Sequence, residues 1–226
     1  MLDHRDHPHL AVTVVRATDI VVKPLRLEQL APQSDVLQGG QGDDQLNGGV
    51  GIDTAQFAGS FANYITSSQK SVFVVSDKRS NGEGLDVLTH IERLKFSDKS
   101  VAIDLDGHAG IAVKVIGAVL GKDAVKNPGL VGIGLSYLDN DLSYSDLGFL
   151  ALNAIGATSN DAIVSKLWFN LVGSTASASD KAPYIKMLAD GMKPGDFVVM
   201  AADLPLNTYN IGLVGLMQTG VEFALG

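Results

Sequence analysis

Hydrophobic residues follow two different spacings along the chain. Up to about residue 106, apolar residues form short runs rich in β-branched side chains, separated by Gly, Asn, Asp and Ser. Such runs are typical of strands joined by turns. From His108 onward, apolar residues recur every three or four positions, as they do along one face of a helix. The pattern therefore predicts an α+β chain in two parts, which meet at about residues 105–108.

The first part contains several strand-like segments. Residues 10–27 predict two short strands around residues 17–19, and residues 64–77 predict a hairpin. Residues 79–86 (RSNGEGLD) have the composition of a turn, and residues 87–105 predict two more short strands.

The second part predicts a bundle of helices with recognisable ends. Asn127 followed by Pro128 is typical of an N-cap and a first helical position, and Ser159 or Asn160 fits another cap. In DNDLSYSD, at residues 139–146, we expect Ser143 or Ser145 to cap a helix rather than the loop to bind a metal. The expected helices lie near 108–120, 128–138, 145–155, 160–172, 181–190, 195–203 and 208–224.

A weak internal duplication is visible within the helical part. SYLDNDLSYSDLGFLAL aligns with KMLADGMKPGDFVVMAA at an offset that matches Leu138 with Leu188 and Asp146 with Asp196. The expected helices align as well, which supports the duplication.

Composition and charge narrow the classes of function. The chain has 226 residues, 46% of them hydrophobic, and a net charge of −8, so it is expected to fold and not to bind nucleic acid. It has no cysteine, which excludes disulfides and thiolate metal sites. No apolar run is long enough to span a bilayer. The start, MLDHRDHPHL, lacks the pattern of an export signal, which by itself indicates a cytosolic protein.

The segment that indicates a specific chemistry is GGQGDDQLNGGVGIDTA, at residues 39–55. It contains two consecutive nonapeptides of the form G-G-x-G-x-D-x-U-x, where U is apolar, and an imperfect unit with Asp35 and Leu37 precedes them. Glycines allow a tight turn with inward carbonyls, the Asp supplies a carboxylate, and x-U-x is a short strand that buries one side chain. Stacked units of this kind form a short parallel β-roll whose loops clamp Ca²⁺.

We expect this segment to hold one or two calcium ions. Loops of a roll alternate between two sides, so the 48–53 loop is expected to pair with residues 30–35, and the 39–44 loop with residues 57–62 (FAGSFA). A glycine-rich turn without an ion is the alternative, but crowded carboxylates would then repel one another. The candidate ligands are the carboxylates of Asp44, Asp53 and Asp35 and the carbonyl groups around Gly40, Gly42, Gly49 and Gly51.

The repeat resembles the calcium-binding nonapeptide of RTX (repeats-in-toxin) proteins, which bacteria secrete by the type I, ABC-transporter-driven route. Residues 82–105 resemble the flank that often closes such rolls, where NIERL.FSDG is usual; this chain has His90 and Lys99 at the Asn and Gly positions. The helical part is similar to an uncharacterised helical domain often found behind RTX repeats. It keeps residues 120–122 (LGK) and 129–130 (GL) of the pattern LGR.PD..GL.YW and lacks the Trp.

The resemblance adds a domain division and a location. We divide the chain into N-terminal strands with a loose terminus (1–33), the roll with its flanking β region (34–106) and the helical domain (107–226). Because RTX proteins carry an uncleaved export signal at the C-terminus, the resemblance implies a bacterial protein found outside the cell or at its surface. Calcium is scarce inside cells, so the roll would fold only after export.

The expected function is that of a non-enzymatic calcium-binding protein of the cell surface or extracellular matrix, for example in adhesion. No group of residues forms a catalytic motif. Two alternatives are a secretion and folding module of a type I secreted enzyme, and a lectin-like binder of surface polysaccharide or cell envelope. Four aromatic residues of the helical part are predicted to lie in its core, and an exposed one among them would be a candidate for stacking on a sugar: Trp168, Phe169, Tyr184 and Phe197.

Overall fold

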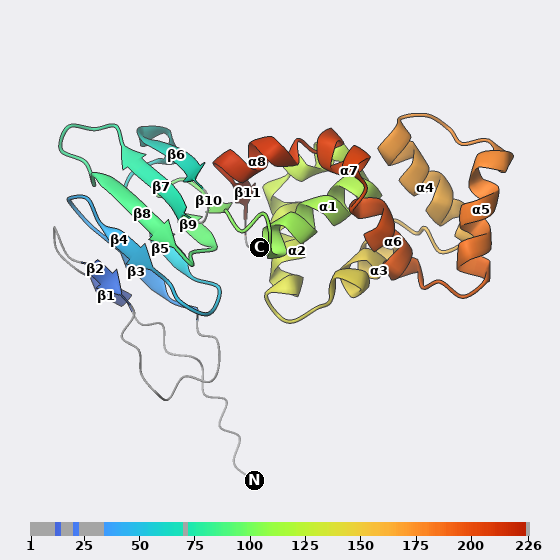
Figure 1. The fold of residues 1–226 in the computed structure, drawn as a ribbon, viewed down its shortest axis with the longest axis horizontal. Helices are drawn as coiled ribbons and strands as arrows, with labels where there is room; N and C mark the ends of the chain where they lie inside the picture. Colours follow the sequence, from blue (N-terminus) through green and yellow to red (C-terminus); the bar gives the residue numbers. More distant parts are fainter. Residues whose placement is uncertain (1–11, 15–19, 23–33, 70–71, 225–226) are drawn as a thin grey trace, which may run out of the picture. The chain divides into compact units, whose positions relative to one another are not determined.

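The computed structural model shows two compact units, Met1–Ile103 and Asp104–Gly226 (Figure 1). The first unit is built from strands and the second mainly from helices, so the predicted α+β class is confirmed. Most of the section predicted at residues 1–33 lies outside the described residues. The structure describes residues 12–14, 20–22, 34–69 and 72–224.

The strands of the first unit agree in part with the sequence pattern. Two strands lie within residues 10–27, and residues 64–77 form the predicted hairpin. Residues 85–105 form three strands rather than two, the first of which begins inside the segment predicted as a turn. The strands are β1 (Val12–Val14), β2 (Ile20–Val22), β3 (Val36–Gln38), β4 (Gln45–Asn47), β5 (Thr54–Gln56), β6 (Tyr64–Gln69), β7 (Val72–Asp77), β8 (Leu85–Thr89), β9 (Arg93–Lys95) and β10 (Ser100–Ala102).

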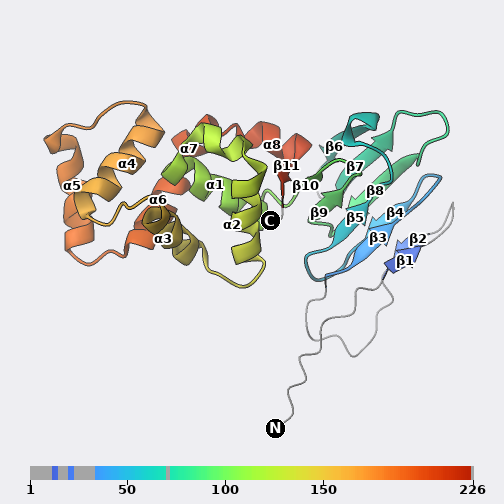
Figure 2. The same cartoon turned by 180° about the vertical axis from the view of Figure 1, so that it is seen from behind.

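Successive strands at the start of the unit alternate between two sheets, as both views show (Figures 1 and 2). β1, β3, β5 and β9 lie side by side and parallel in one sheet, and β2, β4 and β8 do so in the other. The central residues of β3, β4 and β5 are Leu37, Leu46 and Ala55, and all three belong to one buried core cluster. One apolar residue in each nonapeptide is therefore enough to form this core, because each short strand buries a single side chain.

A hairpin and an aromatic cluster complete this unit. β6 and β7 are antiparallel, and β7 pairs antiparallel with β8 at the edge of the second sheet. The rings of Phe57 and Phe96 stack with centroids 5.1 Å apart, and Phe61 and Tyr64 pack against the same Phe96 ring. Aromatic side chains thus form the core in the part of the unit that lies outside the nonapeptides.

Helix α1 lies at the centre of the second unit and contacts five of the other helices. Six of the seven predicted helices are confirmed within three residues at each end, as are the caps at Asn127, Ser143 and Ser159. No helix in the described residues is both long and apolar enough to cross a bilayer. The helices are α1 (His108–Leu120), α2 (Pro128–Leu138), α3 (Tyr144–Ala154), α4 (Asn160–Val172), α5 (Ala178–Ala189), α6 (Pro194–Ala202), α7 (Pro205–Asn210) and α8 (Leu213–Thr219), with a 3-10 helix η2 (Lys122–Lys126) and a strand β11 (Val221–Phe223).

Two expectations for this unit are wrong. The helix predicted at residues 208–224 is interrupted at Gly212 (φ 66°) and Gly220 (φ 74°), because a residue with positive φ ends a helix. It is replaced by α7, α8 and β11. Phe169, predicted to lie in the core, is 54% exposed because it lies on the outer face of α4.

The predicted duplication appears as two copies of the same turn. Asp141 (φ 66°) and Gly191 (φ 108°) occupy matching positions after α2 and α5. In each turn the following amide donates to a carbonyl five residues back, from Leu142 to Tyr137 at 3.0 Å and from Met192 to Met187 at 3.1 Å. The helices that follow these turns, α3 and α6, pack against each other.

This packing predicts opposite effects for two Gly→Ala substitutions. A methyl group on Gly195 would overlap the carbonyl oxygen of Ser145, whereas one on Gly215 in α8 would meet no atom within 4 Å. We expect Gly195→Ala to destabilise the unit by about 1–3 kcal/mol. Gly215→Ala is expected to stabilise it by up to about 1 kcal/mol through helix propensity. Urea unfolding followed by Trp168 fluorescence measures both, and equal effects would contradict the close packing of α3 on α6.

Candidate functional site

The loop at residues 39–44 lies beside the loop at residues 81–86. Each loop leads into a strand, and β4 and β8 are parallel with Leu46 opposite Leu88. The amide of Gly42 donates to the Glu83 carbonyl at 3.1 Å, and the amide of Leu85 donates to Asp43 Oδ1 at 2.8 Å. The two loops are therefore stacked in register.

This arrangement corrects the predicted partner of the 39–44 loop. Residues 57–62 do not stack on it but lead into the 3-10 helix η1 (Phe61–Asn63) and the β6–β7 hairpin. The actual partner belongs to residues 81–89, NGEGLDVLT, which repeat the form x-G-x-G-x-D-x-U-x. The signal for a third nonapeptide was thus present in the sequence, displaced by the inserted hairpin. The residues that the structure brings next to the candidate ligands and that the sequence reasoning missed are Glu83, Gly84, Asp86 and Glu92.

Glycines shape these loops through their backbone conformation and their lack of a side chain. The four glycines proposed as sources of carbonyl ligands all have positive φ, from 87° to 139°. A Cβ on Gly39 would lie 2.6 Å from Asp44 Oδ2, and a Cβ on Gly48 would lie 2.6 Å from Asp53 Oδ2. The carboxylate that ends each loop is therefore folded back over the first glycine of the same loop, in the space that a side chain would fill.

Asp44 and Asp86 form the acidic centre of the stacked loops. Both are 2% exposed, and Asp86 Oδ1 accepts a hydrogen bond from the Asp44 amide at 3.1 Å. Burial, together with the negative charges of Asp44, Glu83 and Asp43, raises the pKa of Asp86 to about 7, against the lowering effect of that hydrogen bond. Four carboxyl groups thus lie near one another in two loops.

The second nonapeptide loop, residues 48–53, lies on a different face. Asp53 is fully buried; its Oδ1 accepts from the Asp35 amide and its own amide donates to Glu92 Oε2, both at 2.7 Å. The predicted pairing with residues 30–35 is seen only at Asp35, because residues 30–33 lie outside the described residues. On the other side, only residues 90–92 separate β8 from β9, so no full nonapeptide loop follows.

The predicted ligands are consequently divided between two faces. Three of them belong to the loop that stacks on residues 81–86: Gly40, Gly42 and Asp44. The other four belong to the face that contains Glu92: Asp35, Gly49, Gly51 and Asp53. Within the described residues, no three His, Cys, Asp or Glu side chains are grouped so as to hold a metal ion. A cation on the first face would thus have two carboxylates, and backbone oxygens would have to complete its ligands.

Glu83 fixes the 81–86 loop to the core of the unit. Its amide donates to Asp77 Oδ2 at 2.9 Å, and its carboxylate accepts from the Ala58 amide at 3.1 Å and from the Tyr64 hydroxyl. Arg79 donates to the same hydroxyl at 3.1 Å and forms an ion pair with Asp77. Burial and the bond to Glu83 raise the pKa of Tyr64, so it stays a neutral donor. The loop is thereby held by side chains that do not belong to the repeat.

Comparisons with known proteins give no further identification. No protein-family model matches the chain, and no curated protein matches it. The resemblance to RTX repeats therefore rests on the nonapeptides themselves, now with a third copy whose loop stacks on the first. What the loops do is accordingly inferred from their geometry.

Removing one hydroxyl tests the anchoring of the 81–86 loop. Tyr64→Phe keeps the aromatic packing but removes the acceptor for Gly59 and Arg79 and the donor to Glu83. We expect the opening free energy of β7 and β8, measured by amide hydrogen exchange, to fall by about 1–3 kcal/mol. Tyr209→Phe, at a site that is 83% exposed, should change nothing. Unchanged exchange in Tyr64→Phe would show that the network does not hold the loop.

The crowded carboxylates predict that the stability of the first unit depends on pH when a chelator removes calcium. A carboxyl group whose pKa is raised by folding stabilises the fold at low pH, and this stability is lost as the pH rises through the folded pKa. The first unit should therefore be less stable at pH 8 than at pH 5. Asp86→Asn, which keeps an oxygen for the Asp44 amide, should flatten this slope in calorimetric scans. Asp106→Asn, which removes an exposed acid, is the control; equal slopes in all three proteins would contradict the prediction.

Proposed function

We propose that the first unit is a short calcium-binding β-roll and that its main calcium site lies between the loops at residues 39–44 and 81–86. The chain would then be a secreted, non-enzymatic protein of the cell surface or extracellular matrix. The observation that carries the proposal is the stacking of two nonapeptide loops in register, with Asp44 and Asp86 buried side by side.

The donor groups of this face suit calcium. Calcium takes six to eight oxygen ligands and accepts backbone carbonyls together with carboxylates. Asp44 and Asp86 supply two carboxylates, and the glycines of the two loops supply backbone with positive φ, in which carbonyls can turn inward. Zinc prefers nitrogen and sulfur ligands, which these loops lack. The bound ion would neutralise carboxylates that otherwise repel one another.

The two faces would not be equivalent. The first face has two loops of six residues each, 39–44 and 81–86, whereas the 48–53 loop has the three-residue segment 90–92 beside it. Glu92 there already accepts the Asp53 amide. We therefore assign the tighter binding to the first face and a weaker site to the face of Asp35 and Asp53.

Calcium would also couple folding to location. An ion that binds only the folded state stabilises it according to its free concentration. In the calcium-poor interior of a cell, repulsion among Asp43, Asp44, Glu83 and Asp86 would disfavour the stacked loops. Outside, calcium would favour them. This coupling suits export in an unfolded form through a type I exporter, as the resemblance to RTX repeats implies.

Calcium titration of single Asp variants tests the proposal. By calorimetry, we expect Asp86→Asn to weaken the tighter site by about tenfold or more, which corresponds to the loss of one charged ligand (about 1.4 kcal/mol per tenfold). Asp53→Asn should weaken mainly the second site, and Asp106→Asn should bind like the wild type. Calcium should also raise the unfolding temperature of the first unit. If the wild type shows neither binding heat nor this thermal shift, the proposal is wrong.

A further inference from the structure

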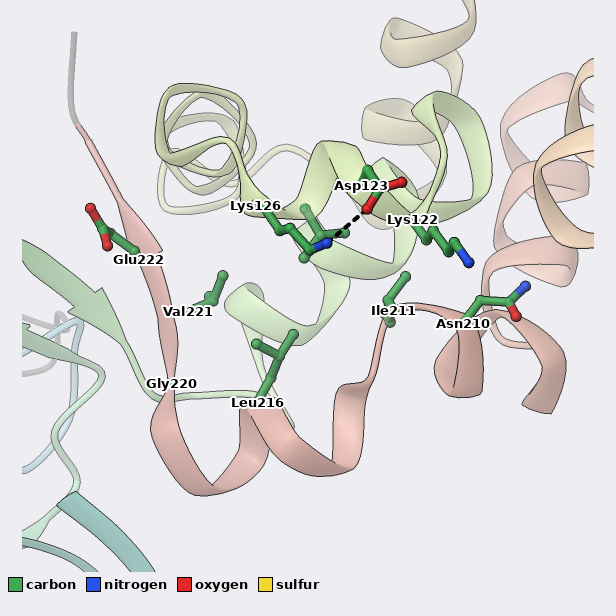
Figure 3. A pocket seen from close by; sticks show the side chains of 10 residues that line it. Lys122, Asp123, Lys126, Asn210, Ile211, Leu216, Gly220, Val221 and Glu222 are labelled. Carbon is green, nitrogen blue, oxygen red and sulfur yellow. Dashed lines mark hydrogen bonds and ion pairs between the residues drawn. The ribbon is translucent and has the colours of Figure 1, made fainter. Parts of the chain in front are cut away.

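The second unit contains two adjoining pockets that share lining residues from η2 and α7, and we call them together the groove. The larger pocket has a volume of about 520 Å³ (Figure 3) and the other about 370 Å³. Both volumes are in the range of about 300–1,000 Å³ that is usual for small-molecule sites. Lys122, Asp123 and Asn210 line both pockets, so they lie at the junction of the groove.

The groove has apolar surfaces on both sides of this junction. In the larger pocket the buried side chains of Val125, Ile211 and Val221 form the lining. In the smaller pocket Phe169 is 54% exposed and Val172 is similarly exposed. An exposed aromatic side chain in a pocket provides a flat apolar face for a ligand to stack on.

The polar groups at the junction have unused binding capacity. Lys126 pairs with Asp123 at 2.8 Å, whereas Lys122 forms no hydrogen bond or ion pair with any described residue. Asn210 donates its Nδ2 to the Leu171 carbonyl at 2.8 Å, and no described donor bonds to its Oδ1. The junction thus offers an ammonium group and an amide acceptor, and the Lys122 and Asn210 side chains lie on the same side of the pocket (Figure 3).

We propose that this groove binds an acidic saccharide. A uronic acid combines the three features that the groove matches: a carboxylate for Lys122, hydroxyl donors for Asn210 Oδ1, and an apolar ring face for Phe169. A fatty acid would match the charge and the apolar lining but would leave the amide acceptor at the junction without a donor, which carries a free-energy cost. The proposal uses residues of the second unit alone and none of the proposed calcium ligands.

The number of unpaired lysines restricts which acidic saccharide fits. Lys126, the other lysine of the larger pocket, is already paired with Asp123. A second carboxylate would therefore meet no unpaired lysine among the lining residues, and it would lose the hydration of its charge without compensation. A saccharide in which uronic acid alternates with a neutral sugar therefore suits the groove better than a polyuronate.

The test compares matched ligands and matched variants in the full chain. The probe is a tetrasaccharide of alternating glucuronic acid and N-acetylglucosamine, compared with its carboxyl-reduced form and with a glucuronic acid tetramer. Titration calorimetry with the wild type, in chelator and again in calcium, should give the tightest binding for the alternating acid in both buffers. Lys122→Met should weaken its binding about tenfold and remove the preference over the reduced form.

Phe169→Ala should weaken the acid and reduced forms equally, because the ring contacts the apolar face of the sugar in both. Lys186→Met and Phe149→Ala, at exposed sites outside the groove, are the controls and should bind like the wild type. The proposal is overturned if no saccharide binds, if the controls lose as much affinity as Lys122→Met and Phe169→Ala, or if a fatty acid or an acidic peptide binds in the groove in place of the saccharides.

Discussion

The first unit depends on burying a carboxylate at the end of each loop. Asp44, Asp53 and Asp86 are almost fully shielded from solvent, an environment that penalises a negative charge unless it is compensated. Backbone amides of neighbouring loops provide part of this compensation. The carboxylates of Asp44 and Asp53 also require glycine at the start of their loops, because they occupy the space of a Cβ there. The glycine–aspartate spacing, the parallel stacking and the proposed cation binding therefore have one physical cause.

The inserted hairpin changes how the repeats are stabilised. Because residues 57–80 intervene between the second and third nonapeptides, the 81–86 loop has contacts that a plain stack of repeats lacks. Glu83 connects it to Tyr64 and Ala58, next to the aromatic cluster of Phe57 and Phe96. One side of the proposed calcium site is thus fixed by a conventional hydrophobic core. Such preorganisation reduces the ordering cost of binding.

Local signals in the sequence predicted the elements well, and long-range pairing poorly. The caps at Asn127, Ser143 and Ser159 and the 3.6-residue period define the helices, since both depend on neighbouring residues. The partner of the 39–44 loop depends on which distant strand pairs with β4, and regular spacing suggested residues 57–62. Only recognition of NGEGLDVLT as a third repeat would have indicated residues 81–86. The exposure of Phe169 also escaped prediction, because helical spacing alone does not tell which face of α4 is covered.

The two units depend on solution conditions in different ways. The helical unit is held by apolar packing around α1 and by neutral hydrogen bonds, such as those from the buried Asn207 amide to the Lys114 and Ala202 carbonyls. None of these contacts requires a cation. The loops of the first unit concentrate negative charge, so their stability should respond to calcium and pH. A ligand groove lined only by residues of the helical unit would therefore contain none of the charges that respond to calcium. Calcium would then control the first unit without directly controlling what the second unit binds.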